Sequence, residues 1–293
     1  MTTARALTAV HLNPRTARAG CLERLPASLA MLSALEPDVL AGFPGRRAAL
    51  VVAHPGHELR VHGWLERVRP RVFVLTDGGG AGGISRVHAT ARVLADAGAD
   101  AGGVFGRLSD RAVYTAMLDG DLGLFCGLAD ELAVALADVD YVVGDAAEGY
   151  NPAHDVCRLL IDAAVARAGR VSGHAPGNFA FPLTGGPREG MASGRGRVEL
   201  WLDDDALGRK LAAARGYREL AGELRGTLDA VGEEAFRLEA FAPAGAPPLA
   251  GAETPYYERH GARRVAEGVY ARVLRLREHV LPIAVALARG GAR

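Results

Sequence analysis

Short apolar runs alternate with longer segments of helical periodicity between residues 47 and 170. The apolar runs, which predict strands, are 48–53, 72–76, 101–105 and 139–145. The helical segments are 57–69, 84–97, most of 110–138, and a stretch that begins near His154 and ends near Gly169. This alternation is typical of a parallel sheet with crossover helices. We therefore predict an α/β, Rossmann-like fold with a mostly parallel sheet flanked by helices.

The order of the elements changes after residue 170. Strands are predicted at 179–183, 198–202 and 236–241, and one long helix at 203–231. A Pro- and Ala-rich linker leads to a polar loop at 253–261 and to a last helix at 263–288, which Pro282 would break or kink. Another helix-like patch lies at 22–40. We expect an N-terminal extension (1–46), a central domain (47–244), and a C-terminal loop and helix (245–293) packed on that domain.

Composition narrows the class of protein. Apolar residues make up 49% of the 293 residues, and 34 basic residues balance 34 acidic ones. A neutral balance does not favour nucleic acid or an anionic membrane as a partner, and no apolar run is long enough for a membrane span. The cysteines, Cys21, Cys126 and Cys157, are odd in number and lack metal-binding spacing, as is typical of free thiols. We predict a cytoplasmic protein that acts on a small molecule and that could form a homo-oligomer through its terminal helices.

Histidines follow two of the predicted strands. His54 and His57 lie directly after the first strand, three residues apart, so a turn into the following helix can bring both rings to one point. His154 stands at a helix start after the strand at 139–145. In an open parallel sheet such loops share the carboxyl edge, and their side chains meet only if the two strands are neighbours. We predict a Zn²⁺ site formed by His54, His57 and His154, a ligand set that also suits iron.

The same residues carry a family resemblance. The run AHPGHE at 53–58 resembles the AHPDDE motif of the LmbE-like (PIG-L) zinc-dependent N-deacetylases, and EGYNPAH at 148–154 resembles their GGxHPDH motif. The resemblance covers roughly residues 47–170. It implies an LmbE-like fold with zinc at the positions of His54, His57 and His154. It also implies amide hydrolysis by a zinc-bound hydroxide, most simply N-deacetylation of an amino sugar or small metabolite.

The motifs also depart from the family pattern. Gly56 stands where the family has its general base, and Asn151 stands where a histidine assists at the oxyanion. Three neutral imidazoles would leave zinc with a formal charge of about +2, which favours ionisation of bound water without a dedicated base. Asn151 could still donate a hydrogen bond to an oxyanion. Glu58 and Asp155 could carry the proton, although Glu58 is equally well explained as a first-turn carboxylate that interacts with the helix dipole.

Substrate recognition is expected from polar side chains around this edge. The candidates are Asp77, Tyr150, Tyr257 and Arg259, the last two within the loop predicted at 253–261, which could equally be a packed tail. The glycine-rich loop at 78–83 lacks the residues of a nucleotide-binding motif, so we interpret it as a rim of the site. Two alternatives remain open. One is a redox or other non-hydrolytic metalloenzyme on the same scaffold, and the other is a binding protein that has lost its base.

Overall fold

The computed structural model describes residues 47–189, 197–245 and 253–290, so the patch predicted at 22–40 lies outside the described residues. The described residues form a seven-stranded sheet in the order β3-β2-β1-β4-β5-β7-β6. Its strands are β1 (Ala48–Val52), β2 (Arg71–Thr76), β3 (Asp100–Leu108), β4 (Tyr141–Asp145), β5 (Gly177–Phe181), β6 (Val198–Trp201) and β7 (Leu238–Pro243). The first five in sequence are parallel, and β7 runs antiparallel to both β5 and β6. The prediction of an α/β fold with a mostly parallel sheet is confirmed.

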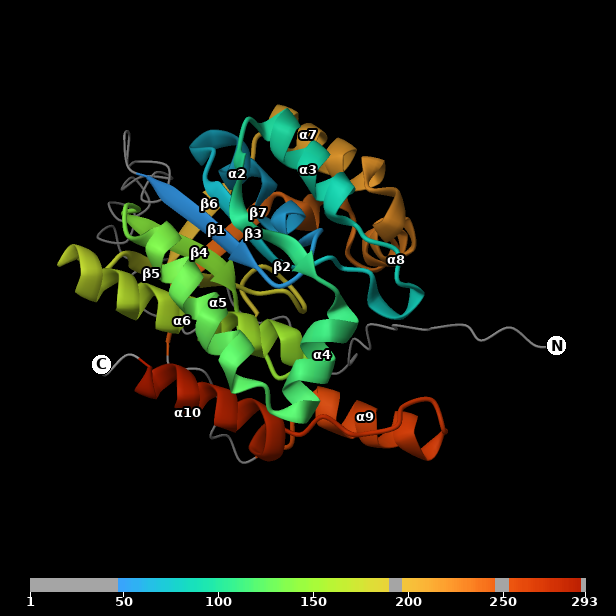
Figure 1. Ribbon diagram of the computed structural model, residues 1–293. Coiled ribbons are helices and arrows are strands. Elements are labelled where there is room, and N and C mark those ends of the chain that lie inside the picture. The colour runs from blue at the N-terminus through green and yellow to red at the C-terminus, as the bar shows by residue number, and fades with distance from the viewer. Residues whose placement is uncertain (1–46, 190–196, 246–252, 291–293) are drawn as a thin grey trace, which may run out of the picture.

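Helices cover both faces of the sheet (Figure 1). One face is covered by α2 (His62–Val68), α3 (Val87–Ala97), α7 (Asp204–Gly216) and α8 (Ala221–Val231). On the other side lie α4 (Asp110–Asp119), α5 (Leu122–Leu136), α6 (Pro152–Ser172), α9 (Tyr256–Ala266) and α10 (Leu281–Arg289). No helix in the described ranges combines the length and the apolar character that a membrane crossing would need.

The central strand β1 shows why the sheet needs two layers of helices. Its residues are all buried, and they alternate between two hydrophobic clusters. Ala49 and Val51 belong to the cluster under α5, α6 and α10, whereas Leu50 and Val52 belong to the one under α2, α3 and α7. Such a continuous apolar run is expected of a parallel strand that is buried on both faces.

The single long helix predicted at 203–231 is wrong. The chain forms α7 and α8, which are separated by a short 3-10 helix at Arg218–Leu220. The break begins at Tyr217, which has a non-helical backbone (φ −84°, ψ 82°) and a buried side chain. Its hydroxyl lies 2.9 Å from Thr90 Oγ1 on α3. Burial of this ring against the neighbouring helix therefore outweighs continuity of the helix.

The C-terminal predictions at 253–261 and 263–288 are also wrong in detail. Most of the expected polar loop is the helix α9, and the helix expected to follow is interrupted after Ala266. Gly268 has a positive φ of 70°, and helical structure resumes only with a π-helical turn at Leu276–Val280 and then α10. Pro282 lies in the first turn of α10, directly after the π-helical turn. The segment packs through Leu276, Val280 and Ile283 against the cluster that includes α5 and α6.

Candidate functional site

The two histidine-bearing loops emerge from neighbouring strands. β1 pairs with β4 in parallel register, for example Ala49 with Val142, so the loops that follow both strands leave the same edge of the sheet. After β4 the chain turns into α6 at Asn151, whose side-chain oxygen accepts a hydrogen bond from Ala153 N–H at 2.9 Å. This cap and Pro152 fix the start of the helix, so His154 is held in its first turn.

The three predicted imidazoles meet at this edge. Their ring centroids lie 5.3 Å apart for His54 and His57, 5.2 Å apart for His54 and His154, and 4.7 Å apart for His57 and His154. Three imidazoles that each bind one tetrahedral zinc through a nitrogen at ~2.0–2.1 Å have ring centroids about 5 Å apart. The positions of the rings therefore suit one shared cation.

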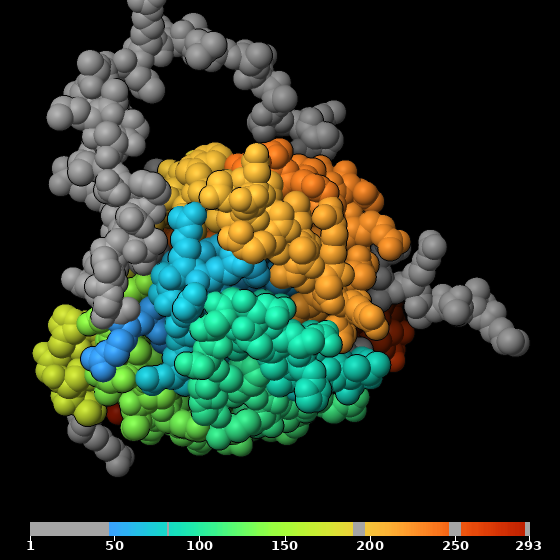
Figure 2. Space-filling model, turned by 90° about the horizontal axis from the view of Figure 1, so that it is seen from above, coloured from blue at the N-terminus to red at the C-terminus, as the bar shows by residue number. Residues whose placement is uncertain are grey.

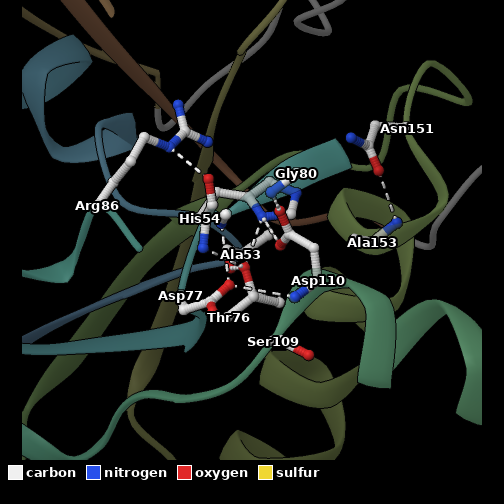
Figure 3. Close-up of polar contacts among 12 residues, drawn as sticks. Ala53, His54, Thr76, Asp77, Gly80, Arg86, Ser109, Asp110, Asn151 and Ala153 are labelled. Carbon is white, nitrogen blue, oxygen red and sulfur yellow. Dashed lines mark hydrogen bonds and ion pairs between the residues drawn. The ribbon is translucent and has the colours of Figure 1, made fainter. Parts of the chain in front are cut away.

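Some nitrogens of the three rings have polar partners, and others have none. His54 Nδ1 lies 2.7 Å from Thr76 Oγ1 and 3.1 Å from Asp110 Oδ1 (Figure 3). His57 Nδ1 lies 2.9 Å from Asp145 Oδ2. By contrast, His54 Nε2 and His154 Nδ1 are buried and have no hydrogen-bond partner. Buried polar nitrogens without a partner are costly, and a carboxylate behind an imidazole is typical of histidines that bind a metal.

The orientations of the rings fit less well than their positions. As the side chains stand, no three His, Cys, Asp or Glu residues of the described ranges are arranged so that they could hold a metal ion. The three residues therefore fit a metal in their type, in their spacing and in the carboxylates that lie behind two of the rings. Their ring nitrogens do not all point toward one shared ion.

Burial sets the protonation of the site. Desolvation, with the charges of neighbouring histidines, lowers the pKa of His57 and of His154 well below the usual range. Desolvation also raises the pKa of Asp145 to about 7, although Ala53 N–H donates to its carboxylate at 2.7 Å. Burial would raise the pKa of Asp110 too, but its interactions with His54 outweigh burial and hold the value below the usual range. Burial thus favours the neutral form of His57 and His154, the form that binds a metal.

The predicted catalytic side chains are largely engaged in holding the loops. Glu58 is fully buried, and its two oxygens accept from Thr90 Oγ1 at 2.8 Å and from Gly56 N–H at 2.7 Å. Asp155 Oδ1 accepts from the backbone N–H groups of residues 148 and 149 at 3.0 and 3.1 Å. Asn151 Oδ1 accepts from the hydroxyl of Tyr114 at 2.8 Å in addition to its capping bond. In this set, Asn151 Nδ2 and Asp155 Oδ2 are left without a hydrogen bond to another described residue.

The predicted substrate-binding residues do not form one group. Asp77 Oδ1 accepts from the backbone N–H groups of residues 79 and 110, which fixes the glycine-rich loop. Tyr150 stacks on Tyr256, with the ring planes 7° apart and the centroids 4.9 Å apart, on the surface of the molecule. Tyr257 is buried and its hydroxyl has no partner, whereas Arg259 is exposed and donates to the carbonyl of residue 254. Tyr150 and Tyr257 are nevertheless joined to the histidine loops, because Tyr257 N–H donates to Gly149 O at 3.5 Å.

Gly56, at the position where the LmbE-like motif has its general base, has a backbone conformation that disfavours a side chain. Its φ is 104°, a value that L side chains rarely adopt. A Cβ there would overlap Leu220 Cδ1 and lie 3.8 Å from Tyr217 Cζ. A side chain at this position would therefore begin against the segment that joins α7 to α8.

Sequence reasoning missed the two carboxylates behind the histidines. Asp145 is the last residue of β4, and Asp110 is the first residue of α4. The pattern VVGD marks Asp145 as a polar residue at the carboxyl end of a buried strand, a position that could have identified it. Asp110 gives no such signal, because its place beside His54 depends on how β3 and α4 return to the sheet edge.

Comparisons with protein-family models, with curated protein sequences and with solved structures find no match.

Proposed function

We propose that this protein is a metal-dependent hydrolase of the LmbE-like type that cleaves an amide bond. The expected reaction is N-deacetylation of an amino sugar or small metabolite. A zinc ion would be held by His54, His57 and His154. The observation that carries this proposal is the meeting of three imidazoles at one sheet edge, where the buried rings of His54 and His154 each have an unpartnered nitrogen and His57 is partly buried. A zinc bound there would act as a Lewis acid and lower the pKa of a water molecule.

The proposed ligand atoms follow from the hydrogen bonds that the rings make. His54 and His57 each direct Nδ1 at a carboxylate or hydroxyl, so both would bind through Nε2. His154 would bind through Nδ1, which is the atom left without a partner. This combination needs no proton on any nitrogen that faces the ion.

Asn151 would orient a substrate oxygen. Its Oδ1 accepts both the Tyr114 hydroxyl and Ala153 N–H, which fixes the orientation of the amide and leaves Nδ2–H as the donating end. Asn151 precedes His154 by less than one helical turn, so a carbonyl near the histidines would lie within reach of this donor. Tyr114 would act as a positioning residue because it holds the amide in this orientation.

Proton transfer to the leaving amine is assigned to Asp155. Burial raises the pKa of Asp155 to about 6, close to the range in which a carboxyl exchanges protons at neutral pH. The backbone N–H groups engage only Oδ1 of this carboxylate, whereas both oxygens of Glu58 are engaged. Glu58 would thus support the loop that carries His54 and His57.

Elemental analysis of the purified protein tests the metal, and one matched pair of variants tests the ligands. We expect about one zinc per chain in the parent and in His174→Ala, an exposed loop histidine, and none in His154→Ala. Stoichiometric metal in His154→Ala would contradict the ligand assignment. Iron in place of zinc would contradict the assignment of the metal. Release of acetate from a panel of N-acetylated amino sugars, with and without a chelator, then tests the reaction.

A further inference from the structure

A second candidate site lies away from the three histidines, between α2, α3 and α7. These helices meet on the face shown in Figure 2. The cavity has a volume of about 370 Å³, within the range of small-molecule sites, ~300–1,000 Å³. Its lining includes the small or apolar residues Ala89, Val93, Ala212 and Ala213. None of the three histidines of the proposed metal site lines it.

Charged residues of both signs surround the cavity. Glu66 and Arg209 already pair with each other, at 2.9 Å between Oε1 and Nε. Arg92 and Asp96 are exposed on one side of α3, four residues apart, and no described residue forms an ion pair with either of them. An unpaired cation and an unpaired anion one helical turn apart complement a ligand that carries both charges.

A buried imidazole at the cavity lacks a partner. His62 is only 3% exposed, and its Nδ1 forms no hydrogen bond. Glu66 Oε2 lies 4.0 Å from this nitrogen, beyond hydrogen-bond distance. The carboxylate of Glu66 is paired with Arg209 instead. A polar group that enters the cavity could satisfy this nitrogen.

We infer that this cavity binds a small zwitterion of the α-amino acid type. The carboxylate pairs with Arg92, the ammonium pairs with Asp96, and a polar-ended side chain reaches His62 across the alanine-lined wall. The inference does not depend on the proposed hydrolase function, because no residue of the metal site takes part in it.

Calorimetric titration of the full chain with three probes tests the class of ligand. L-Glutamine carries both charges and an amide end, L-norleucine lacks the amide, and L-glutamine α-amide lacks the carboxylate. We expect L-glutamine to bind, and each of the other two to bind about tenfold more weakly, since each loses one polar interaction. If L-glutamine shows no binding at about 10 mM, or if all three bind equally, the inference is wrong.

Three variants place the ligand in the cavity. Arg92→Gln should weaken the binding of L-glutamine about tenfold, because it removes the partner of the α-carboxylate. It should leave the affinity for L-glutamine α-amide unchanged, because that probe has no carboxylate. Ala212→Leu should abolish binding because it fills the cavity. Gly208→Leu adds the same side chain to α7, at a position that has open space around it and does not line the cavity. This control variant should bind L-glutamine as tightly as the parent does. Binding that is unaffected by both Arg92→Gln and Ala212→Leu would place the ligand elsewhere and overturn the inference.

Discussion

Gly56 is the position where the structure gives the sharpest quantitative prediction. Gly56→Asp would restore the carboxylate that the LmbE-like motif has here. The positive φ of 104° costs a non-glycine residue roughly 1–3 kcal/mol, and overlap with Leu220 costs another ~1–3 kcal/mol unless Leu220 moves. We expect Gly56→Asp to lower the free energy of unfolding by about 2–6 kcal/mol. We also expect no gain in amide hydrolysis, because the new side chain would start against Leu220 and Tyr217.

Urea denaturation of four chains separates the two costs. These are the parent, Gly56→Ala, Leu220→Ala and the double variant. Removal of the Leu220 side chain should abolish the cost of the overlap, so the double-mutant cycle should give a favourable coupling of about 1–3 kcal/mol. The cost of the positive φ at position 56 should remain. Parent-like stability of Gly56→Ala would refute the reasoning about strain. A rise in amide hydrolysis in Gly56→Asp would refute the argument that a side chain at position 56 is directed against Leu220 and Tyr217.

Three further predictions use buried titratable groups. Since burial lowers the pKa of His57 and His154, the pH at which metal affinity falls should lie below the ~6.5 expected of ordinary imidazoles; a decline centred at ~6.5 or above, measured by competition with a chelator, would contradict this. Burial raises the pKa of Glu58 from 4.5 to about 7, so the folded state binds this proton more tightly than the unfolded state does. The contribution of Glu58 to the free energy of unfolding therefore falls as pH rises from ~4.5 to ~7. Glu58→Gln should therefore flatten that part of the stability profile, worth up to about 3 kcal/mol, and an unchanged profile would contradict it. Lys210→Met should destabilise the fold by about 3–5 kcal/mol in urea, because it leaves buried Glu239 without its partner at 2.8 Å; a loss under ~1 kcal/mol would contradict this.

The central part of the fold could be predicted because local signals agree there. The run that ends at Ala53 is apolar without interruption, and the next element begins within a few residues, so both the strand and the loop with His54 and His57 are visible in the sequence. The strand that ends at Asp145 repeats the pattern. Strand order is a long-range property, but histidines after two parallel strands limit it, since their rings can meet only if the strands are adjacent.

The parts that could not be predicted depend on contacts between distant segments. The break at Tyr217 reflects a hydrogen bond to Thr90 on α3, and nothing near residue 217 announces that partner. The interruption after Ala266 lies in a segment whose apolar positions also fit one continuous helix. The role of Asp110 depends on the return of β3 and α4 to the edge that holds His54. Local periodicity contains none of these pairings, so it predicts elements more reliably than it predicts their breaks and caps.

Asp145 offers a test that separates support of the metal from support of the fold. The sequence suggested three neutral imidazoles and a formal charge of about +2 at zinc, but the structure places the carboxylates of Asp110 and Asp145 on two of the rings, which offsets that charge. Asp145→Asn keeps an acceptor for Ala53 N–H and removes the charge. Metal affinity should fall about 10- to 100-fold.

Stability of the metal-free chain should respond in the opposite sense. Burial raises the pKa of Asp145 to about 7, so at pH 8 the folded state has to hold an ionised carboxylate that burial disfavours. Removal of that charge should leave the free energy of unfolding at pH 8 unchanged or higher, as measured in urea with a chelator present. A purely structural Asp145 would give lower stability and unchanged intrinsic metal affinity. Those two results together would show that Asp145 does not support the proposed metal site. Weaker metal binding by a variant that is as stable as the parent would instead show that the Asp145 carboxylate supports the metal through His57.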